Sequence, residues 1–300
     1  MHVTPEGRWK LALALGTVYL AWGGTYPAIR VMVETVPPLL GTAARFALAG
    51  VLLGAFLLAR GGRRRFAMSR RQLLGVSAVG VVILGDIGLL ALAEQEVPAG
   101  LAALIIASVP LWIVLLRIAD GQRPRATTMA AVAVGLAGVA LLVTPAGEMS
   151  GPPGGWLLLL VAAAAIEAAG QFYSQRVELP ADLLVSTTVQ LIAAAAILAV
   201  AGIALGETGE IAVERFSADS LFAFAYLVVP GSIVAYMAFV WLLANAPITT
   251  VSTYAYVNPV VAVLVGWALL SEPVTLTIAV GAAAVLLSVA LIVRRGPGAA

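Results

Sequence analysis

Ten long apolar runs decide what this chain of 300 residues can fold into. A helix needs about 20 apolar residues to cross the roughly 30 Å hydrocarbon core of a bilayer, and each run holds about 17 to 24 residues. The runs are uninterrupted and rich in Ala and Leu, whereas a membrane-spanning strand alternates over about ten residues. We therefore predict an all-α integral membrane protein with ten transmembrane helices. The expected spans are 11–29, 39–58, 73–93, 99–118, 127–143, 155–175, 183–205, 221–244, 248–270 and 276–293.

The composition agrees with this interpretation. Hydrophobic residues make up 62% of the chain, charged residues make up 11%, and the mean hydropathy is +1.04. Soluble domains are about half apolar and about a quarter charged. Arg8 and Lys10 precede the first run as in a signal peptide, but the run continues to Ile29 without a small-residue cleavage site, so we interpret it as a retained span. The basic residues fall in loops between runs, which indicates membrane topology and not nucleic-acid binding.

The two halves of the chain share a proline pattern. Three prolines recur 149 residues later, each in the same position relative to an apolar run, which indicates an internal duplication. A Pro/Gly-rich break, TPAGEMSGPPG, separates the copies at residues 144–154. We expect a first five-helix repeat at residues 1–146, a linker at 147–154 and a second repeat at 155–300. The matching pairs are Pro98 with Pro247, Pro110 with Pro259, and Pro124 with Pro273.

The placement of Lys and Arg predicts the orientation of the spans. If both termini and every second loop are placed on one side, that side holds 14 of the 17 basic residues. Basic loops stay in the cytoplasm, so both termini are expected there. Because five spans is an odd number, the second repeat must enter the membrane from the opposite side to the first. Such inverted repeats are a recurring plan of secondary transporters, in which two similar halves expose a midplane site to either face in turn.

With this topology, three stretches resemble the EamA-type transporters of the drug/metabolite transporter (DMT) superfamily. The first is AWGGTYPAIR at residues 21–30, and the second is residues 98–110 with their counterpart 247–259. The third is LLSEPVTLTIAVGAAAVLLSVALIV at residues 269–293, which resembles the family's Glu-Pro turn and Gly-containing last helix. The resemblance implies two inverted five-helix repeats around a central cavity, and transport of metabolites or drugs, often export, without a bound cofactor.

Among members of this family, the chain is similar to amino-acid exporters, including exporters of aromatic amino acids. This narrower resemblance implies a small-molecule substrate, an amino acid or a similar metabolite. The chain departs from the family pattern in the first repeat, where Arg123 precedes Pro124 in place of the glutamate of the Glu-Pro turn. That departure puts a role for this acid in the first repeat in doubt.

Ionisable residues inside the runs are the first candidates for a substrate site, because a polar group at bilayer depth is stable only when it faces the protein interior or water. Asp86 lies near the middle of the third run, between Gly85 and Gly88. It fits a protonatable or cation-pairing group. It equally fits a buried carboxylate that is held by Arg45 or by backbone dipoles.

The sixth run carries a polar stripe. Glu167 and Gln171 lie one helical turn apart, and Ser174 or Gln175 continues the same face. The stripe cannot face lipid, so it fits either a substrate site or a hydrogen-bonded seam between helices. Glu167 is the second titratable candidate, because it lies nearer the middle of its run.

Aromatic residues supply the remaining candidates. Tyr and Trp collect at membrane interfaces for reasons unrelated to ligands, so Tyr19 and Trp241 also fit the interface. An aromatic ring with a polar tip suits an amphiphilic solute, because it combines apolar contact with one hydrogen bond. The cavity candidates of this group, with the amide that follows them in the ninth run, are Trp22, Tyr26, Tyr236, Tyr254 and Asn258.

Pro110 and Pro259 occupy equivalent positions in the fourth and ninth runs. Proline removes one backbone hydrogen bond and permits a kink. Their symmetry predicts a pair of hinges, and static shaping of the two helices explains the same pattern.

An intramembrane enzyme is the alternative of a different class, and each common version lacks a part. The chain has no cysteine and its one histidine is His2, so the spans hold no His-Glu-x-x-His motif, no thiol nucleophile and no triad. Ile83, Leu84 and Gly85 precede Asp86, which lacks the first glycine of the aspartyl Gly-x-Gly-Asp pattern. A channel and a lipid flippase remain alternatives on the same scaffold.

We therefore predict a carrier in the bacterial inner (plasma) membrane that exports small metabolites, with amino acids as the first choice of substrate, by alternating access. No cofactor and no metal site are expected. Protons are the expected coupling ion, carried by Asp86 or Glu167. A generic drug or metabolite transporter, a transporter of lipid-linked solutes and a facilitator are the alternatives.

Overall fold

The computed structural model describes residues 5–143 and 154–295, and every regular element in them is helical. Most of the predicted linker, and the boundary at residue 146, lie outside the described residues. By length and hydropathy, nine helical stretches within the described ranges qualify as membrane spans. The pair α1 and α2 forms one further helical segment at the start of the chain. The prediction of an all-helical membrane protein is confirmed.

The first repeat contains five helical segments, each matching a predicted run to within a few residues. Three of the five are interrupted within the segment. The segments are α1 (Pro5–Gly23) with α2 (Thr25–Met32), α3 (Pro38–Gly61), α4 (Arg70–Ile83) with α5 (Asp86–Ala93), α6 (Ala99–Ile106) with α7 (Val109–Ala119), and α8 (Ala126–Val143), and a short 3₁₀ turn, η1 (Arg63–Phe66), follows α3.

The second repeat follows the same order. Its third segment contains a π-helical stretch around Pro230, and its fourth segment is interrupted early. The segments are α9 (Gly154–Ser174), α10 (Leu183–Ala204), α11 (Ala218–Tyr226) with η4 (Leu227–Val234) and α12 (Ala235–Asn245), α13 (Ile248–Val251) with α14 (Tyr254–Leu270), and α15 (Leu276–Arg295), and the 3₁₀ turns η2 (Glu207–Glu210) and η3 (Val213–Arg215) precede α11.

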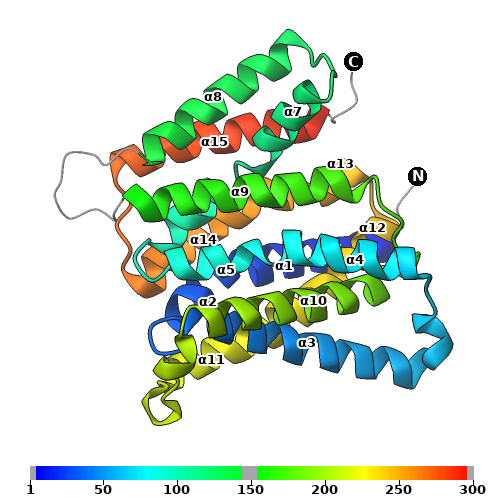
Figure 1. The fold of residues 1–300 in the computed structure, drawn as a ribbon. Coiled ribbons are helices and arrows are strands. Elements are labelled where there is room, and N and C mark those ends of the chain that lie inside the picture. The colour runs from blue at the N-terminus through cyan, green and yellow to red at the C-terminus, as the bar shows by residue number, and fades with distance from the viewer. Residues whose placement is uncertain (1–4, 144–153, 296–300) are drawn as a thin grey trace.

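Equivalent helices of the two repeats pack against each other and run in opposite directions. The α3 helix lies beside α10, and α8 lies beside α15, with the members of each pair antiparallel (Figure 1). The first helix of each repeat packs against the third and fourth segments of the other repeat. The α1 helix packs against α12 and α14, and α9 packs against α5 and α7. This arrangement confirms two inverted repeats.

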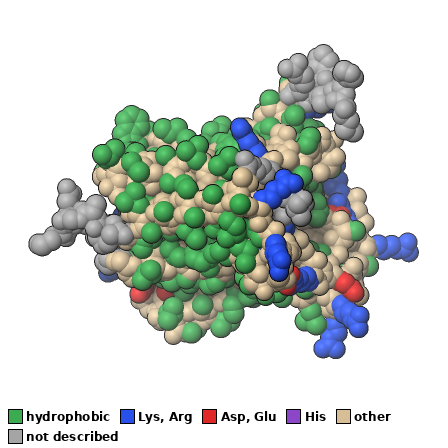
Figure 2. All heavy atoms as spheres, turned by 90° about the horizontal axis from the view of Figure 1, so that it is seen from above, with side chains coloured by type: hydrophobic (Ala, Val, Ile, Leu, Met, Phe, Trp, Pro, Cys, Tyr) green, Lys and Arg blue, Asp and Glu red, His purple; other side chains and the backbone are tan. Residues whose placement is uncertain are grey.

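The two ends of the bundle differ in charge. The start of α1, the connection from α3 to α4 and the end of α15 lie together, and we name this the basic end (Figure 1). Figure 2 shows the bundle from above, with Lys and Arg side chains gathered toward the basic end. Apolar side chains cover most of the rest of the face seen in that view. Phe222 and Leu269 are 75% and 76% exposed, as expected for side chains that face lipid. The other end is named the acidic end.

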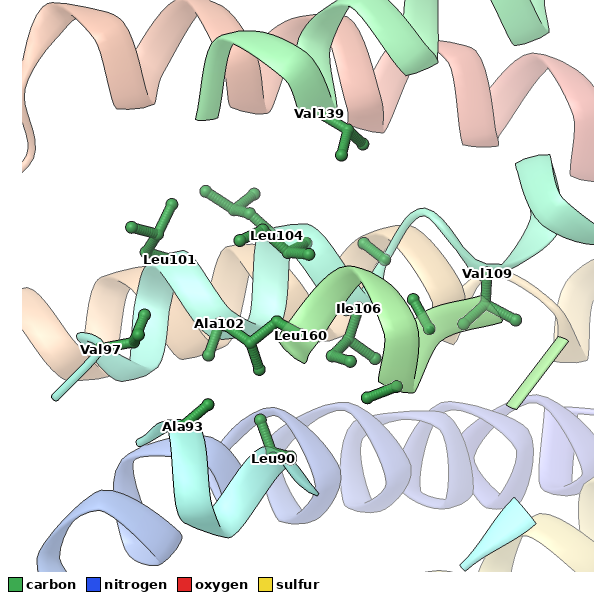
Figure 3. Close-up of a cluster of buried hydrophobic side chains, with 14 of the residues drawn as sticks. Leu90, Ala93, Val97, Leu101, Ala102, Leu104, Ile106, Val109, Val139 and Leu160 are labelled. Atoms are coloured by element: carbon green, nitrogen blue, oxygen red, sulfur yellow. The ribbon is translucent and has the colours of Figure 1, made fainter. Parts of the chain in front are cut away.

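A dense core fills the bundle on the acidic side of its centre. Small and branched side chains from α5, α6, α8 and α9 interlock there (Figure 3). Leu104 and Leu160 are fully buried, as are several alanines of α5 and α6, so the helices approach closely. The labelled residues of this core include Leu90, Ala93, Val97, Leu101, Ala102 and Val139.

Two glutamates of the second repeat cap helices of the first repeat at the acidic end. Glu207 accepts hydrogen bonds from the backbone N–H groups of Leu39 (3.0 Å) and Leu40 (2.7 Å) at the start of α3. Glu272, in the Glu-Pro turn, accepts from Ala99 (2.6 Å) and Gly100 (2.9 Å) at the start of α6. A carboxylate satisfies these otherwise unpaired N–H groups and favours the positive end of the helix dipole.

The structure shows what the first repeat loses by having Arg123 where the second repeat has Glu272. The cap of α6 requires an acceptor, and a guanidinium has donors only. Arg123 therefore cannot repeat for α13 what Glu272 does for α6. The symmetry of the two repeats is broken at this position.

An ion pair joins the repeats at the basic end. Arg65 Nε lies 2.5 Å from Asp182 Oδ2, and Asp182 also caps α10 through the N–H groups of Leu184 and Val185. Partial burial raises the pKa of Asp182, but the hydrogen bonds from Arg65 and the two backbone N–H groups outweigh burial and hold the pKa below its usual value. Both side chains remain about one-third exposed, so this ion pair is expected to contribute less to stability than a buried one.

We predict that Glu207→Ala lowers the thermal stability of the purified protein in detergent. The substitution leaves two N–H groups at the start of α3 unpaired, which costs roughly 1–3 kcal/mol. Glu210→Ala is the matched control, because Glu210 lies on the same short turn but is exposed. Equal melting temperatures for the two variants would contradict the capping role.

Candidate functional site

A cavity of about 400 Å³ lies between the two repeats. Its walls come from α1, α2, α3, α4, α5, α6, α9, α10, η4, α12 and α14, so neither repeat encloses it alone. A second pocket of about 110 Å³ adjoins it, and the two share residues of α2, α9 and α14. All eight residues that the sequence predicts for the substrate site line the larger cavity: Trp22, Tyr26, Asp86, Glu167, Gln171, Tyr236, Tyr254 and Asn258.

Irregular backbone surrounds this cavity. Interruptions at Gly24, at 84–85, at 107–108 and at 252–253, together with η4, fall in the first, third, fourth, eighth and ninth helical segments. Non-helical backbone at membrane depth is stable only where it is buried in protein or borders a cavity. The broken segments therefore mark the part of the bundle where exposed backbone and side-chain polar groups border the cavity and are available to a solute.

Asp86 is placed by one of these interruptions. The α4 helix ends at Ile83, and Asp86 is the first residue of α5. A helix start favours a negative charge. Asp86 is 5% exposed, and its Oδ1 has no hydrogen-bond partner among the described residues. Arg45 forms no ion pair with it in the described parts of the chain, so the alternative of a carboxylate held by Arg45 is not what the structure shows.

The polar stripe of α9 enters the cavity only in part. Gln171 Nε2 donates a hydrogen bond to Glu167 Oε1 at 2.8 Å, and both side chains line the cavity. Ser174 Oγ donates to the carbonyl oxygen of Gln171 at 2.7 Å, and Gln175 is exposed beyond the end of the helix. The stripe therefore lines the cavity at Glu167 and Gln171, whereas Ser174 and Gln175 lie at the end of the helix, outside the cavity wall.

Trp22 is the centre of an aromatic cluster. Its ring centroid lies 5.2 Å from that of Tyr236, 5.1 Å from Phe239 and 5.3 Å from Tyr254, in edge or tilted geometries that aromatic pairs prefer. The indole Nε1 donates a hydrogen bond to the carbonyl oxygen of Gly231 at 3.0 Å. That carbonyl belongs to η4, so the π-helix fixes the orientation of Trp22. The cluster forms a rigid apolar wall.

Tyr26 and Asn258 lie where the two pockets meet. Asn258 is buried on α14, and its Oδ1 has no hydrogen-bond partner among the residues that the structure describes. An unpaired amide oxygen beside a cavity is available to a ligand donor.

The two symmetric prolines line the smaller pocket but differ in context. Pro110 follows the interruption at 107–108 and stands in the first turn of α7, where proline is well tolerated. Pro259 lies inside the continuous helix α14, seven residues after Ser252 at the nearest interruption. A hinge role for Pro110 and Pro259 stays a prediction.

Among the cavity residues that sequence reasoning did not nominate, three add aromatic, amide or charged groups. Phe239 completes the aromatic cluster, Gln190 adds an amide from α10, and Arg45 places a guanidinium in the wall. Arg45 could have been nominated from the sequence, because it lies inside an apolar run, which is the criterion that identified Asp86. No group of three or more potential metal ligands occurs in residues 5–143 and 154–295.

Part of the cavity wall reaches toward the basic end. Gln171 is near the end of α9 and Tyr254 begins α14, and both of these helix ends face the basic side of the bundle (Figure 1). On the acidic side, Leu90 of the cavity wall belongs to the dense core together with Leu101 and Ala102 (Figure 3). Packed side chains therefore separate the cavity from the acidic end.

A membrane-embedded bundle of two inverted repeats with a polar cavity between them defines a membrane transporter of small molecules. The chain belongs to the EamA-like transporter family, which matches residues 9–144 and 154–294, once in each repeat. The chain is 36% identical over 261 residues to the Uncharacterized inner membrane transporter YedA of Escherichia coli K12, covering 86% of this chain and 82% of the relative. The YedA proteins of the O6:H1 and O157:H7 strains match equally.

A solved structure described as "Crystal structure of protein" shares the fold. The TM-score is 0.63 with 23% sequence identity, and the alignment covers 94% of this chain and 95% of the other. At this identity the likeness speaks for the fold alone.

We predict that Gln171→Cys reacts with a membrane-impermeant thiol reagent applied at the basic end, because the side chain lines the cavity. The chain has no cysteine, so a single substitution gives an unambiguous signal. Ala102→Cys is the control, since Ala102 is fully buried in the core and Cys is a small change. Labelling of both positions at similar rates would show that the core does not seal the cavity as described.

Proposed function

We propose that this transporter is a carrier in the bacterial inner membrane that exports amino acids, including aromatic ones, by alternating access. The observation that carries the proposal is the cavity, which combines an aromatic wall with charged groups of both signs. Trp22 and Tyr254 offer apolar area, while Arg45, Asp86 and Glu167 offer charge. A free amino acid has the same combination of an apolar side chain and two opposite charges. The relative YedA carries the name of an inner membrane transporter, which supports the proposed location.

The cavity is of a suitable size for such a solute. Sites for small molecules have volumes of about 300–1,000 Å³ and combine apolar walls with a few placed polar groups. The larger cavity has about 400 Å³.

The inverted symmetry supports alternating access. In the described state, packed core and the caps from Glu207 and Glu272 close the acidic end. Because the repeats are related by inversion, exchanging their conformations opens the acidic end and closes the basic end. We place the basic end and both termini in the cytoplasm, in line with the distribution of Lys and Arg. The carrier would then load from the cytoplasm.

The test is transport by proteoliposomes that contain the purified protein. We expect saturable uptake or counterflow of at least one amino acid from a panel that includes phenylalanine, threonine and methionine. Absence of transport for the entire panel would contradict the amino-acid substrate and favour another metabolite. Conductance that does not saturate would contradict the carrier and favour a channel.

We further propose that protons drive export through Asp86 and Glu167. Both carboxylates line one cavity at bilayer depth, where a group that binds and releases a proton couples its charge to the conformation. Asp86→Asn and Glu167→Gln keep the shape of each side chain but remove its ability to bind and release a proton.

We predict that at least one of these two variants exchanges labelled substrate across the membrane at a rate near wild type but no longer accumulates it against a gradient. The measurement compares counterflow with uptake driven by an imposed pH gradient. If both variants respond to the pH gradient as the wild type does, the protein is a facilitator and coupling through these residues is wrong.

A further inference from the structure

Arg45 carries a guanidinium that the protein leaves unpaired. The residue lies on α3, is 4% exposed and lines the larger cavity. Its Nε and Nη1 have no hydrogen-bond partner within the described ranges, and it forms no ion pair there. Its Cζ lies 4.5 Å from the centroid of the Phe46 ring, a cation–π contact that holds the group in place.

An unpaired charge at this depth is expensive. Buried ionised groups in proteins are normally paired or hydrogen-bonded, because moving them out of water without a partner costs several kcal/mol. Glu94 and Tyr236 lie within electrostatic range of Arg45, but neither bonds to it. The charge is therefore retained for a partner that the protein itself does not supply.

The same cavity also contains unpaired acceptors. Asp86 Oδ1 and Asn258 Oδ1 are buried without hydrogen-bond partners among the described residues. Donors of Arg45 and acceptors of Asp86 and Asn258 are thus unsatisfied in one space without satisfying each other. A ligand with an anionic acceptor at one end and a cationic donor at the other would satisfy both sets.

We propose that Arg45 binds the carboxylate of the transported solute and that Asp86 and Asn258 bind its ammonium group. The inference rests on the proposed function and deepens it, because it restricts the substrate to solutes with a carboxylate. Arginine suits this role, since its planar fork donates two parallel hydrogen bonds to a carboxylate. The apolar part of the solute lies against the aromatic cluster around Trp22.

The experiment measures binding by ligand-induced thermal stabilisation of the full-length protein in detergent, with three related solutes. Phenylalanine has both charged groups, 3-phenylpropionate has the carboxylate alone, and phenethylamine has the ammonium alone. The variants are Arg45→Met, which keeps length and removes charge, Arg45→Lys, which keeps charge and removes the fork, and Asp86→Asn.

We predict that Arg45→Met weakens binding of phenylalanine and 3-phenylpropionate on the order of a hundredfold, as expected when one member of a buried charge pair is removed. Binding of phenethylamine is retained or improved, because the repulsion from Arg45 is gone. Arg45→Lys keeps part of the binding of both carboxylates. Asp86→Asn shows the reverse selectivity, with phenethylamine affected and 3-phenylpropionate retained.

A structural role for Arg45 makes a different prediction for the ligand-free protein. Removing an unpaired buried charge leaves the melting temperature unchanged or raises it. Arg30→Met is the control, since Arg30 donates hydrogen bonds to the carbonyl oxygens of Glu94 and Gln95 and its loss lowers the melting temperature. A lower melting temperature for ligand-free Arg45→Met, or equal loss of all three solutes, would overturn the inference.

The outcomes separate this inference from the proposed function. Wild-type protein that binds 3-phenylpropionate through Arg45 but transports no amino acid would support the carboxylate site and contradict amino-acid export. Transport of phenylalanine that is unaffected by Arg45→Met would support export and overturn the inference. Wild-type protein that is stabilised by neither carboxylate would also overturn it.

Discussion

The absence of water in the bilayer core is the constraint on which this structure depends. Every backbone group and every charge at that depth needs a partner inside the protein or beside a hydrated space. In a chain with 11% charged residues, Arg45, Asp86 and Glu167 inside the helices therefore gather around one cavity. Asp86 at the start of α5 and Trp22 on the π-helical carbonyl of Gly231 show how the breaks themselves place the functional groups.

In the proposed carrier, the inverted repeats give this static arrangement two states. The contacts that join the repeats differ between the ends, with charged caps by Glu207 and Glu272 at the acidic end and the partly exposed Arg65–Asp182 pair at the basic end. The acidic end is thus held by buried and partly buried hydrogen bonds, whereas the Arg65–Asp182 pair is partly exposed and is expected to be weaker.

Much of this could be predicted from the sequence, because membrane spans require long apolar runs and because polar residues inside them are few. Those two facts predicted the helices and the polar cavity residues. The repeated prolines and the placement of Lys and Arg predicted the inverted duplication. Aromatic cavity residues such as Trp22 were predicted because a ring with a polar tip suits an amphiphilic solute. The π-helix around Pro230 and the caps on α3 and α6 could not be predicted, since they depend on which helices meet in three dimensions. For the same reason the sequence left pairing of Asp86 with Arg45 as one of several alternatives, whereas the folded chain forms no ion pair between the two.

Alternation of the two repeats around one cavity is the central claim, and a reversible cross-link at the acidic end tests it most directly. The Ser217 backbone N–H of the second repeat donates to Thr35 Oγ1 of the first at 3.1 Å, and the chain has no native cysteine. In a Thr35→Cys/Ser217→Cys double variant, oxidation should stop transport in proteoliposomes while substrate binding persists, and a reductant should restore transport. Transport at the same rate in the oxidised and reduced states would contradict alternating access.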